Sequence, residues 1–141
     1  MTTQAGYSGT PLPRKLGIKP GHRVLLVDAP GDFDLGPVPD DVVLHQRAGR
    51  RPYDVILAFC PDLATVERRF LPLIERLVPN GGLWVAWPKK SSGLGTDLDE
   101  NLIRDIGLAA GVVDNKVCAV DHTWSGLRFV YRLTDRPGAT G

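Results

Sequence analysis

The sequence predicts an α/β protein with a mostly parallel sheet and helices on both faces. Residues 54–60 (DVILAFC) form an apolar run that is typical of a strand buried on both sides. A segment with helical periodicity and a second apolar run follow it, so the two strands are expected to be parallel, with a right-handed crossover. Two more strand-like runs come after the last predicted helix, and the final strand should therefore be antiparallel to its neighbour.

Length and composition predict one domain. The chain has 141 residues, which suits a single hydrophobic core. We expect a flexible arm over residues 1–10, the α/β domain over residues 11–133 and a disordered tail over residues 134–141. The formal net charge of +1 gives no electrostatic support for binding nucleic acid or a membrane surface.

The sequence also bears on location and on metals. It has no run of about 18 apolar residues and no basic-then-apolar secretion signal, so we expect a cytoplasmic protein without membrane contact. Cys60 and Cys118 form no C-x-x-C motif and fall in predicted strands, which favours buried, reduced thiols. The three histidines lack metal-ligand spacing, so no metal site is predicted.

The first half of the chain predicts short elements around a long loop. Residues 10–17 are expected to hold one short helix that a glycine ends, and residues 23–27 form a buried strand. Residues 29–41 are rich in Pro, Gly and Asp, which predicts a loop where a crossover helix would otherwise stand. Residues 42–46 form a short second strand.

The clearest helix covers residues 62–78, because apolar residues recur along one stripe at spacings of three and four. Pro72 lies inside it and removes one backbone hydrogen bond, so we expect a kink or two short helices. The Asn-Gly-Gly sequence at residues 80–82 is expected to end this helix before a strand at residues 83–87.

The last third predicts a helix and two strands. The helix covers residues 97–110, and its start carries a capping box of Asp97 with Glu100 three residues later. The strands are expected over residues 112–120 and 127–133.

Two resemblances follow from these segments. DVILAFCP and LVPNGGLWV are similar to the D-x-V-x-x-x-x-P and L-x-P-G-G strand pair of methyltransferase-like Rossmann proteins, a resemblance that covers residues 22–133. GYSGTPL, WVAWPKK and KVCAVDHTWSGL resemble a small bacterial family of domains of unknown function. The second resemblance covers nearly the whole chain and implies no activity.

The segment after the first predicted strand departs from the methyltransferase pattern. A cofactor loop needs several glycines so that backbone can approach the ligand, and here Gly31 stands between Pro30 and Asp32. Asp28 matches the acid that often closes this strand, but residues 45–47 (His-Gln-Arg) provide no acid for ribose hydroxyls. The loop is also too short for the full pocket. We therefore predict no cofactor and no S-adenosylmethionine-dependent methyltransferase activity.

A ligand site is predicted at the carboxyl ends of the parallel strands, where ligands of open α/β sheets bind. Its candidate residues are Asp28, Asp32, Cys60, Lys89, Lys90, Asp121, His122 and Trp124. A small anionic or nucleotide-like ligand would pair with Lys89 or Lys90 and stack on Trp124. The alternative is that the charged residues form surface ion pairs that contribute little, while Trp124 packs against its own hairpin.

No catalytic residue is assigned from the sequence. Asp121 and His122 could act with Cys60 as a nucleophile, but only geometry can decide this. Adjacent strand residues point to opposite faces, so Asp121 is not expected to orient His122. Cys60 is expected to be a small buried residue.

These observations favour a non-catalytic module that binds a small ligand or a protein partner on a degenerate methyltransferase-like scaffold. One alternative is an enzyme of unknown reaction that uses Asp28, Lys89, Asp121 and His122. The other is a homodimeric regulatory protein that pairs through an open sheet edge.

Overall fold

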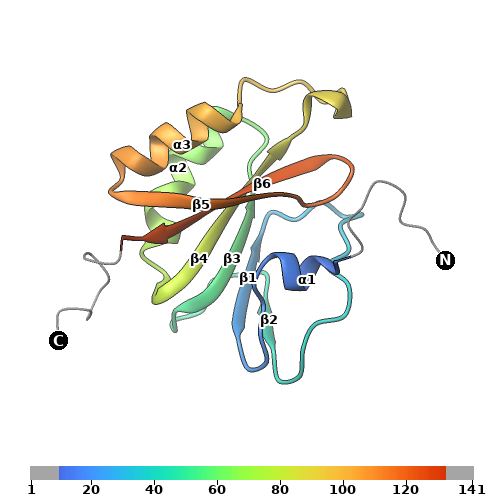
Figure 1. Cartoon of the computed structure of the whole chain (residues 1–141), viewed down its shortest axis with the longest axis vertical. Coiled ribbons are helices and arrows are strands. Elements are labelled where there is room, and N and C mark those ends of the chain that lie inside the picture. The colour runs from blue at the N-terminus through green and yellow to red at the C-terminus, as the bar shows by residue number, and fades with distance from the viewer. Residues whose placement is uncertain (1–9, 133–141) are drawn as a thin grey trace.

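The computed structural model describes residues 10–132, which form one six-stranded sheet with helices on both faces (Figure 1). The strand order is β2-β1-β3-β4-β6-β5. The strands are β1 Arg23–Val27, β2 Val43–His45, β3 Tyr53–Phe59, β4 Leu77–Pro88, β5 Val112–Ala119 and β6 Trp124–Tyr131. β1 to β4 pair in parallel, whereas β6 is antiparallel to β4 and β5, which confirms the predicted fold class. The predicted tail and nearly all of the predicted arm lie outside the described residues.

Different elements cover the two faces of the sheet. Helices α2 (Leu63–Ile74) and α3 (Glu100–Ala109) lie on one face, over buried residues such as Ile56 and Leu83. The short helix α1 (Leu12–Lys15) and the segment after β1 lie on the other face, over a separate apolar cluster. Trp84 and Trp87 belong to different clusters, because side chains three apart on a strand point to opposite faces.

Residues 28–42 contain no helix, as the Pro and Gly content predicts. The sheet is covered there by apolar side chains of the loop itself. Leu35 is 8% exposed, and the Phe33 ring packs edge-on against Phe59 with the ring centroids 4.9 Å apart. A loop in place of a helix leaves open space between the loop and the first two strands.

Helix α2 is shorter than predicted, because residues 77–78 belong to the sheet. Asp62 caps its start by accepting hydrogen bonds from the amide and the hydroxyl of Thr65. The helix ends at Ile74, and Leu77, the first residue of β4, is already paired with Tyr53 of β3. Pro72 lies inside α2 without dividing it into two helices. Among residues 10–132, no helix is long and apolar enough to cross a membrane.

The Asn-Gly-Gly sequence does not form the predicted turn, since residues 80–82 lie inside β4. A Cβ atom at Gly81 would lie 2.9 Å from the Asp54 carbonyl oxygen, and one at Gly82 would lie 2.3 Å from Nε of Arg128. The pairing of β3 with β4 is irregular at this point. Gly81 is therefore needed for the close approach of the two backbones, whereas a side chain at Gly82 would displace the Arg128 guanidinium.

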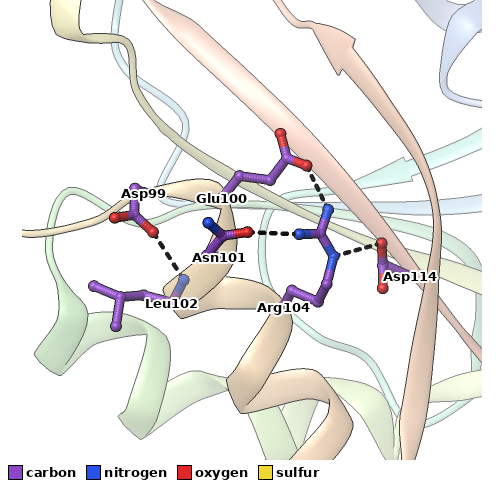
Figure 2. A network of polar contacts seen from close by, with 6 residues as sticks. All are labelled: Asp99, Glu100, Asn101, Leu102, Arg104 and Asp114. Atoms are coloured by element: carbon purple, nitrogen blue, oxygen red, sulfur yellow. Dashed lines mark hydrogen bonds and ion pairs between the residues drawn. The ribbon is translucent and has the colours of Figure 1, made fainter.

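The predicted capping box at Asp97 is also wrong, because the N-cap of α3 (Glu100–Ala109) is Asp99, two residues later. Asp99 caps α3 through a hydrogen bond from the Leu102 amide (Figure 2). Asp97 instead accepts a hydrogen bond from the Leu63 amide at the start of α2. Arg104 then fastens α3 to β5. Figure 2 shows its guanidinium between Glu100 and Asn101 of its own helix and Asp114 of β5.

Candidate functional site at the carboxyl edge of the sheet

The predicted ligand-site residues lie in two groups along this edge. Asp28 and Cys60 follow β1 and β3, which are neighbours in the sheet. The other group stands where β4 ends and β6 begins, and consists of Lys89, Lys90, Asp121, His122 and Trp124. Asp32 is exposed in the loop after β1. Their role in ligand binding stays a prediction.

Asp28 forms an ion pair that the sequence does not reveal. Its Oδ2 lies 2.7 Å from an Nη atom of Arg69 on α2, and its backbone adopts a left-handed conformation with φ of 57°. The two side chains are 54% and 34% exposed, so the pair contributes little to stability. Nε of Arg69 is buried and meets no hydrogen-bond acceptor among the described residues.

Cys60 is part of the hydrophobic core on the face of the sheet that α2 and α3 cover. It is 1% exposed, and its Sγ atom is 3.9 Å from the Ala58 carbonyl oxygen. Burial raises the pKa of the Cys60 thiol to about 12. The thiol is therefore protonated at neutral pH, so this geometry does not support a role for Cys60 as a nucleophile.

Raising the pH above 9 is expected to reduce stability through Cys60. The thiol deprotonates near 9.0 in the unfolded chain but near 12 in the folded one, so the folded protein holds more protons in this range. The free energy of unfolding should fall by up to about 1.4 kcal/mol per pH unit between those values. Urea unfolding from about pH 8 to pH 10 measures the slope. The Cys60→Ala variant should show a shallower slope, and parallel curves for the two proteins would contradict the assignment.

The second group is organised by a turn. Oδ1 of Asp121 accepts hydrogen bonds from the amides of Thr123, at 2.8 Å, and of Trp124, at 2.9 Å. The Lys89 amide donates to the Thr123 carbonyl oxygen, so the turn is bound to the end of β4. This turn lets β6 begin at Trp124, three residues before the predicted start.

Trp124 packs against the protein rather than lying open to a ligand. It is 8% exposed, and its ring contacts Phe59 edge-on with the centroids 5.1 Å apart. The best-defined cavities among residues 10–132 are not lined by any of Asp28, Lys89, Asp121 and His122. These four residues are thus not gathered around one of those cavities.

A cavity of about 480 Å³, here the β1–β2 cavity, does open at this edge. It lies between the carboxyl ends of β1 and β2 and the loop that follows β1. Its walls include Leu26, Gly31, Phe33, Asp34, Leu44 and Gln46. The length of the loop predicts no room for a full cofactor pocket here, but the loop stands far enough from the strands to leave this space.

Gly31 and Asp34 lie in the loop that borders the cavity. A Cβ atom at Gly31 would meet no atom within 4 Å, so the packing of the described residues does not require a glycine there. Oδ1 of Asp34 accepts a hydrogen bond of 2.9 Å from the Gly36 amide, which turns the loop. Among the described residues, no group of three His, Cys, Asp or Glu side chains could hold a metal ion.

Sheet order, antiparallel final strands and helix placement together define a methyltransferase-like Rossmann fold. The chain is similar to magnesium protoporphyrin IX methyltransferase from Synechocystis PCC 6803, solved with bound S-adenosylmethionine. The identity is 12% over 80% of this chain and 71% of that one, with a TM-score of 0.57.

Two further methyltransferase structures show the same similarity. A S-adenosylmethionine-dependent methyltransferase from Aquifex aeolicus is 16% identical over 82% of this chain and 85% of that one, with a TM-score of 0.55. A TehB-like one from Corynebacterium glutamicum is 10% identical over 91% of each chain, with a TM-score of 0.56. No protein family model and no curated protein matches the chain, so the resemblance to a family of unknown function is not confirmed.

These comparisons contradict the functional interpretation that the sequence favoured. A non-catalytic module came first in that interpretation, because the Gly-rich loop is missing. The solved structures of similar fold include S-adenosylmethionine-dependent methyltransferases, and this finding stands against that interpretation.

Proposed function

We propose that this chain is a S-adenosylmethionine-dependent methyltransferase that binds the adenosine part of the cofactor in the β1–β2 cavity. The observation that carries the proposal is a cavity of about 480 Å³ at the carboxyl ends of β1 and β2 in a methyltransferase-like sheet. Its volume falls within the range of about 300–1,000 Å³ that is common for small-molecule sites. Open α/β sheets bind their ligands at this end of the strands.

The lining of the cavity suits a nucleoside. Leu26, Phe33 and Leu44 offer apolar surface for a base, and Asp34 and Gln46 carry polar groups able to bond ribose hydroxyls. The open space at Gly31 lets backbone approach a ligand. Residues 45–47 provide no acid where the resembled family has one, so the hydrogen bonds to ribose would come from the Gln46 amide or from Asp34.

When bound, S-adenosylmethionine supplies an activated methyl group, and the chain must hold the acceptor beside it. We propose that the acceptor lies along the rest of the carboxyl edge. A small anionic or nucleotide-like molecule, or a protein side chain, would fit the charges of Lys89 and Lys90 there. We also propose that the chain belongs to the family of unknown function, because the strings GYSGTPL, WVAWPKK and KVCAVDHTWSGL resemble that family.

Calorimetric titration with S-adenosylmethionine and S-adenosylhomocysteine tests the proposal. The wild-type chain should bind at least one of them and show a raised melting temperature in its presence. Gly31→Leu adds bulk at the cavity wall without a clash in the chain, so it should weaken binding by about tenfold or more while leaving the unliganded melting temperature unchanged.

Ala48→Leu is the matched control, because Ala48 is exposed and does not line the cavity. It places the same leucine side chain in a nearby loop and should bind both compounds as the wild type does. Absence of binding by the wild-type chain would overturn the proposal, and so would equal binding by the Gly31→Leu variant.

A further inference from the structure

A second cavity lies at the opposite edge of the sheet, near the amino ends of the parallel strands. This amino-edge cavity has a volume of about 260 Å³. It lies on the face that α1 covers, and α1, β3, β4, β5 and β6 all contribute to its walls. The charged and titratable residues that line it are Lys15, Lys19, His22, Asp54, Lys116 and Arg128.

The cavity has an excess of positive charge. Four cationic side chains of the described residues face one carboxylate, that of Asp54. The carboxylate is already engaged, since its Oδ2 accepts a 2.8 Å hydrogen bond from the Arg23 amide and its Oδ1 lies 4.0 Å from Nε2 of His22. One carboxylate balances only one of these four positive charges.

Arg128 is the central residue of this positively charged cavity. Its side chain is half-buried, and its Nε atom is buried and meets no acceptor among the described residues. Desolvation lowers the pKa of its guanidinium, and no ion pair with a described carboxylate offsets this effect. A partly desolvated charge without a counter-charge is costly, so an anion in the cavity would supply the missing counter-charge for the guanidinium.

The backbone leaves room for this arginine. Gly82 lies under the guanidinium, and a Cβ atom there would lie 2.3 Å from Nε and 2.7 Å from Cζ of Arg128. Lys116 stands opposite Arg128 on the paired strand β5, so two cations from neighbouring strands share this part of the surface. Lys15 enters from α1, where its Nζ atom donates to the Ala119 carbonyl oxygen at 3.1 Å.

We propose that the amino-edge cavity binds a small phosphate-bearing anion, either inorganic phosphate or a small phosphomonoester. Arginine and lysine are the side chains that bind phosphate oxygens best, and Arg128 is held ready with unused donors. A volume of about 260 Å³ is below the usual range of sites for larger ligands, which favours a small anion over a dinucleotide. This site is separate from the β1–β2 cavity and does not depend on methyl transfer.

Calorimetry and thermal unfolding of the full chain test the site, with inorganic phosphate and glycerol 3-phosphate as probes at constant ionic strength. Either probe should raise the melting temperature at concentrations up to about 10 mM, which fill a millimolar site. Glycerol should have no such effect. Tighter binding of glycerol 3-phosphate than of inorganic phosphate would identify a phosphomonoester as the ligand, and the reverse order would identify free phosphate.

Three variants locate the binding, and one serves as control. Arg128→Gln should weaken it by about tenfold or more. Gly82→Ala should weaken it similarly, because the added methyl displaces the guanidinium without changing the charge. Lys116→Gln, at an exposed position that cannot disturb the core, should weaken it roughly two- to fivefold. Arg14→Gln removes an exposed charge from α1 outside the cavity and should bind as the wild type does.

The proposal is overturned if neither probe binds the wild-type chain. It is equally overturned if probes bind but Arg128→Gln and Lys116→Gln bind as tightly as the wild type, since phosphate would then lie elsewhere. Should Arg128→Gln fail to fold, the Lys116→Gln and Arg14→Gln pair decides the question. Loss of binding in both would show a nonspecific charge effect and reject the site.

Discussion

Replacing Trp84 with alanine should destabilise the protein by about 3–5 kcal/mol, the largest effect expected of a single side chain here. Trp84 is 0% exposed and lies at the centre of the apolar cluster beneath α1. Its ring packs against Gly126 of β6, with Cε3 3.1 Å from the position of a Cβ atom there. Its Nε1 donates a 3.0 Å hydrogen bond to the carbonyl oxygen of Leu16, 68 residues away in sequence.

Because Trp84→Ala is expected to be near the limit of folding, Trp84→Phe isolates the hydrogen bond. Phenylalanine keeps most of the apolar contact but leaves the Leu16 carbonyl without its partner, which should cost about 1–3 kcal/mol. The amides of Gly17 and Ile18, which bond to Arg14 and Pro13, should then exchange hydrogen faster.

Trp87→Phe is the matched control for this experiment, because Trp87 lies in the cluster on the opposite face. It should leave hydrogen exchange near α1 unchanged. If Trp84→Phe and Trp87→Phe change exchange at Gly17 and Ile18 to the same degree, the indole does not anchor α1.

The Gly107→Ala substitution should lower the free energy of unfolding by about 1–3 kcal/mol, although alanine is the better helix former by about 1 kcal/mol. Gly107 lies in the buried face of α3, and a Cβ atom there would lie 2.1 Å from Cε1 of Phe129. Phe129 is 0% exposed and packs edge-on against Phe70, so its ring has little freedom to move. The clash should therefore outweigh the gain in helix propensity.

Urea unfolding of a double-mutant cycle measures this clash. Phe129→Leu makes room for the added methyl group, so Gly107→Ala should be much less harmful in that background than in the wild type. Asp105→Ala changes an exposed residue of the same helix and should stay within about 0.5 kcal/mol of the wild type. Equal stability of Gly107→Ala and the wild type would show that α3 can move away from β6 at little cost.

The glycines show which features of the fold the sequence alone does not predict. Residues 80–82 predict a turn because glycine is common in turns, yet they lie inside a strand where backbone and a guanidinium come close. Gly107 lies within a predicted helix and carries no sequence signal that a phenylalanine ring occupies the space of its missing side chain. Whether such a glycine lies in a turn, in a strand or in a packed helix depends on residues far away in sequence. Local propensity does not contain that information.

The candidate site also has features that the sequence predicts and features that it does not. The carboxyl edge could be predicted, because parallel strands share one direction and their ends meet. Partners across the edge could not be predicted: the ion pair of Asp28 with Arg69 joins a strand end to a helix face and follows no motif. The amino-edge cavity could not be predicted either, because Lys15, Lys116 and Arg128 are far apart in the sequence and follow no spacing pattern.

What the sequence determined by itself are features set by neighbouring residues: the buried strands, the amphipathic helices, the helix-free loop after β1 and hence the class of fold. These follow from apolar periodicity and from the limits that proline and glycine place on the backbone. Tertiary structure alone decided the extent of β4, the partners of Asp28 and Asp97 and the two cavities. Those features depend on contacts between distant segments, and such contacts exist only once the sheet has brought the segments together.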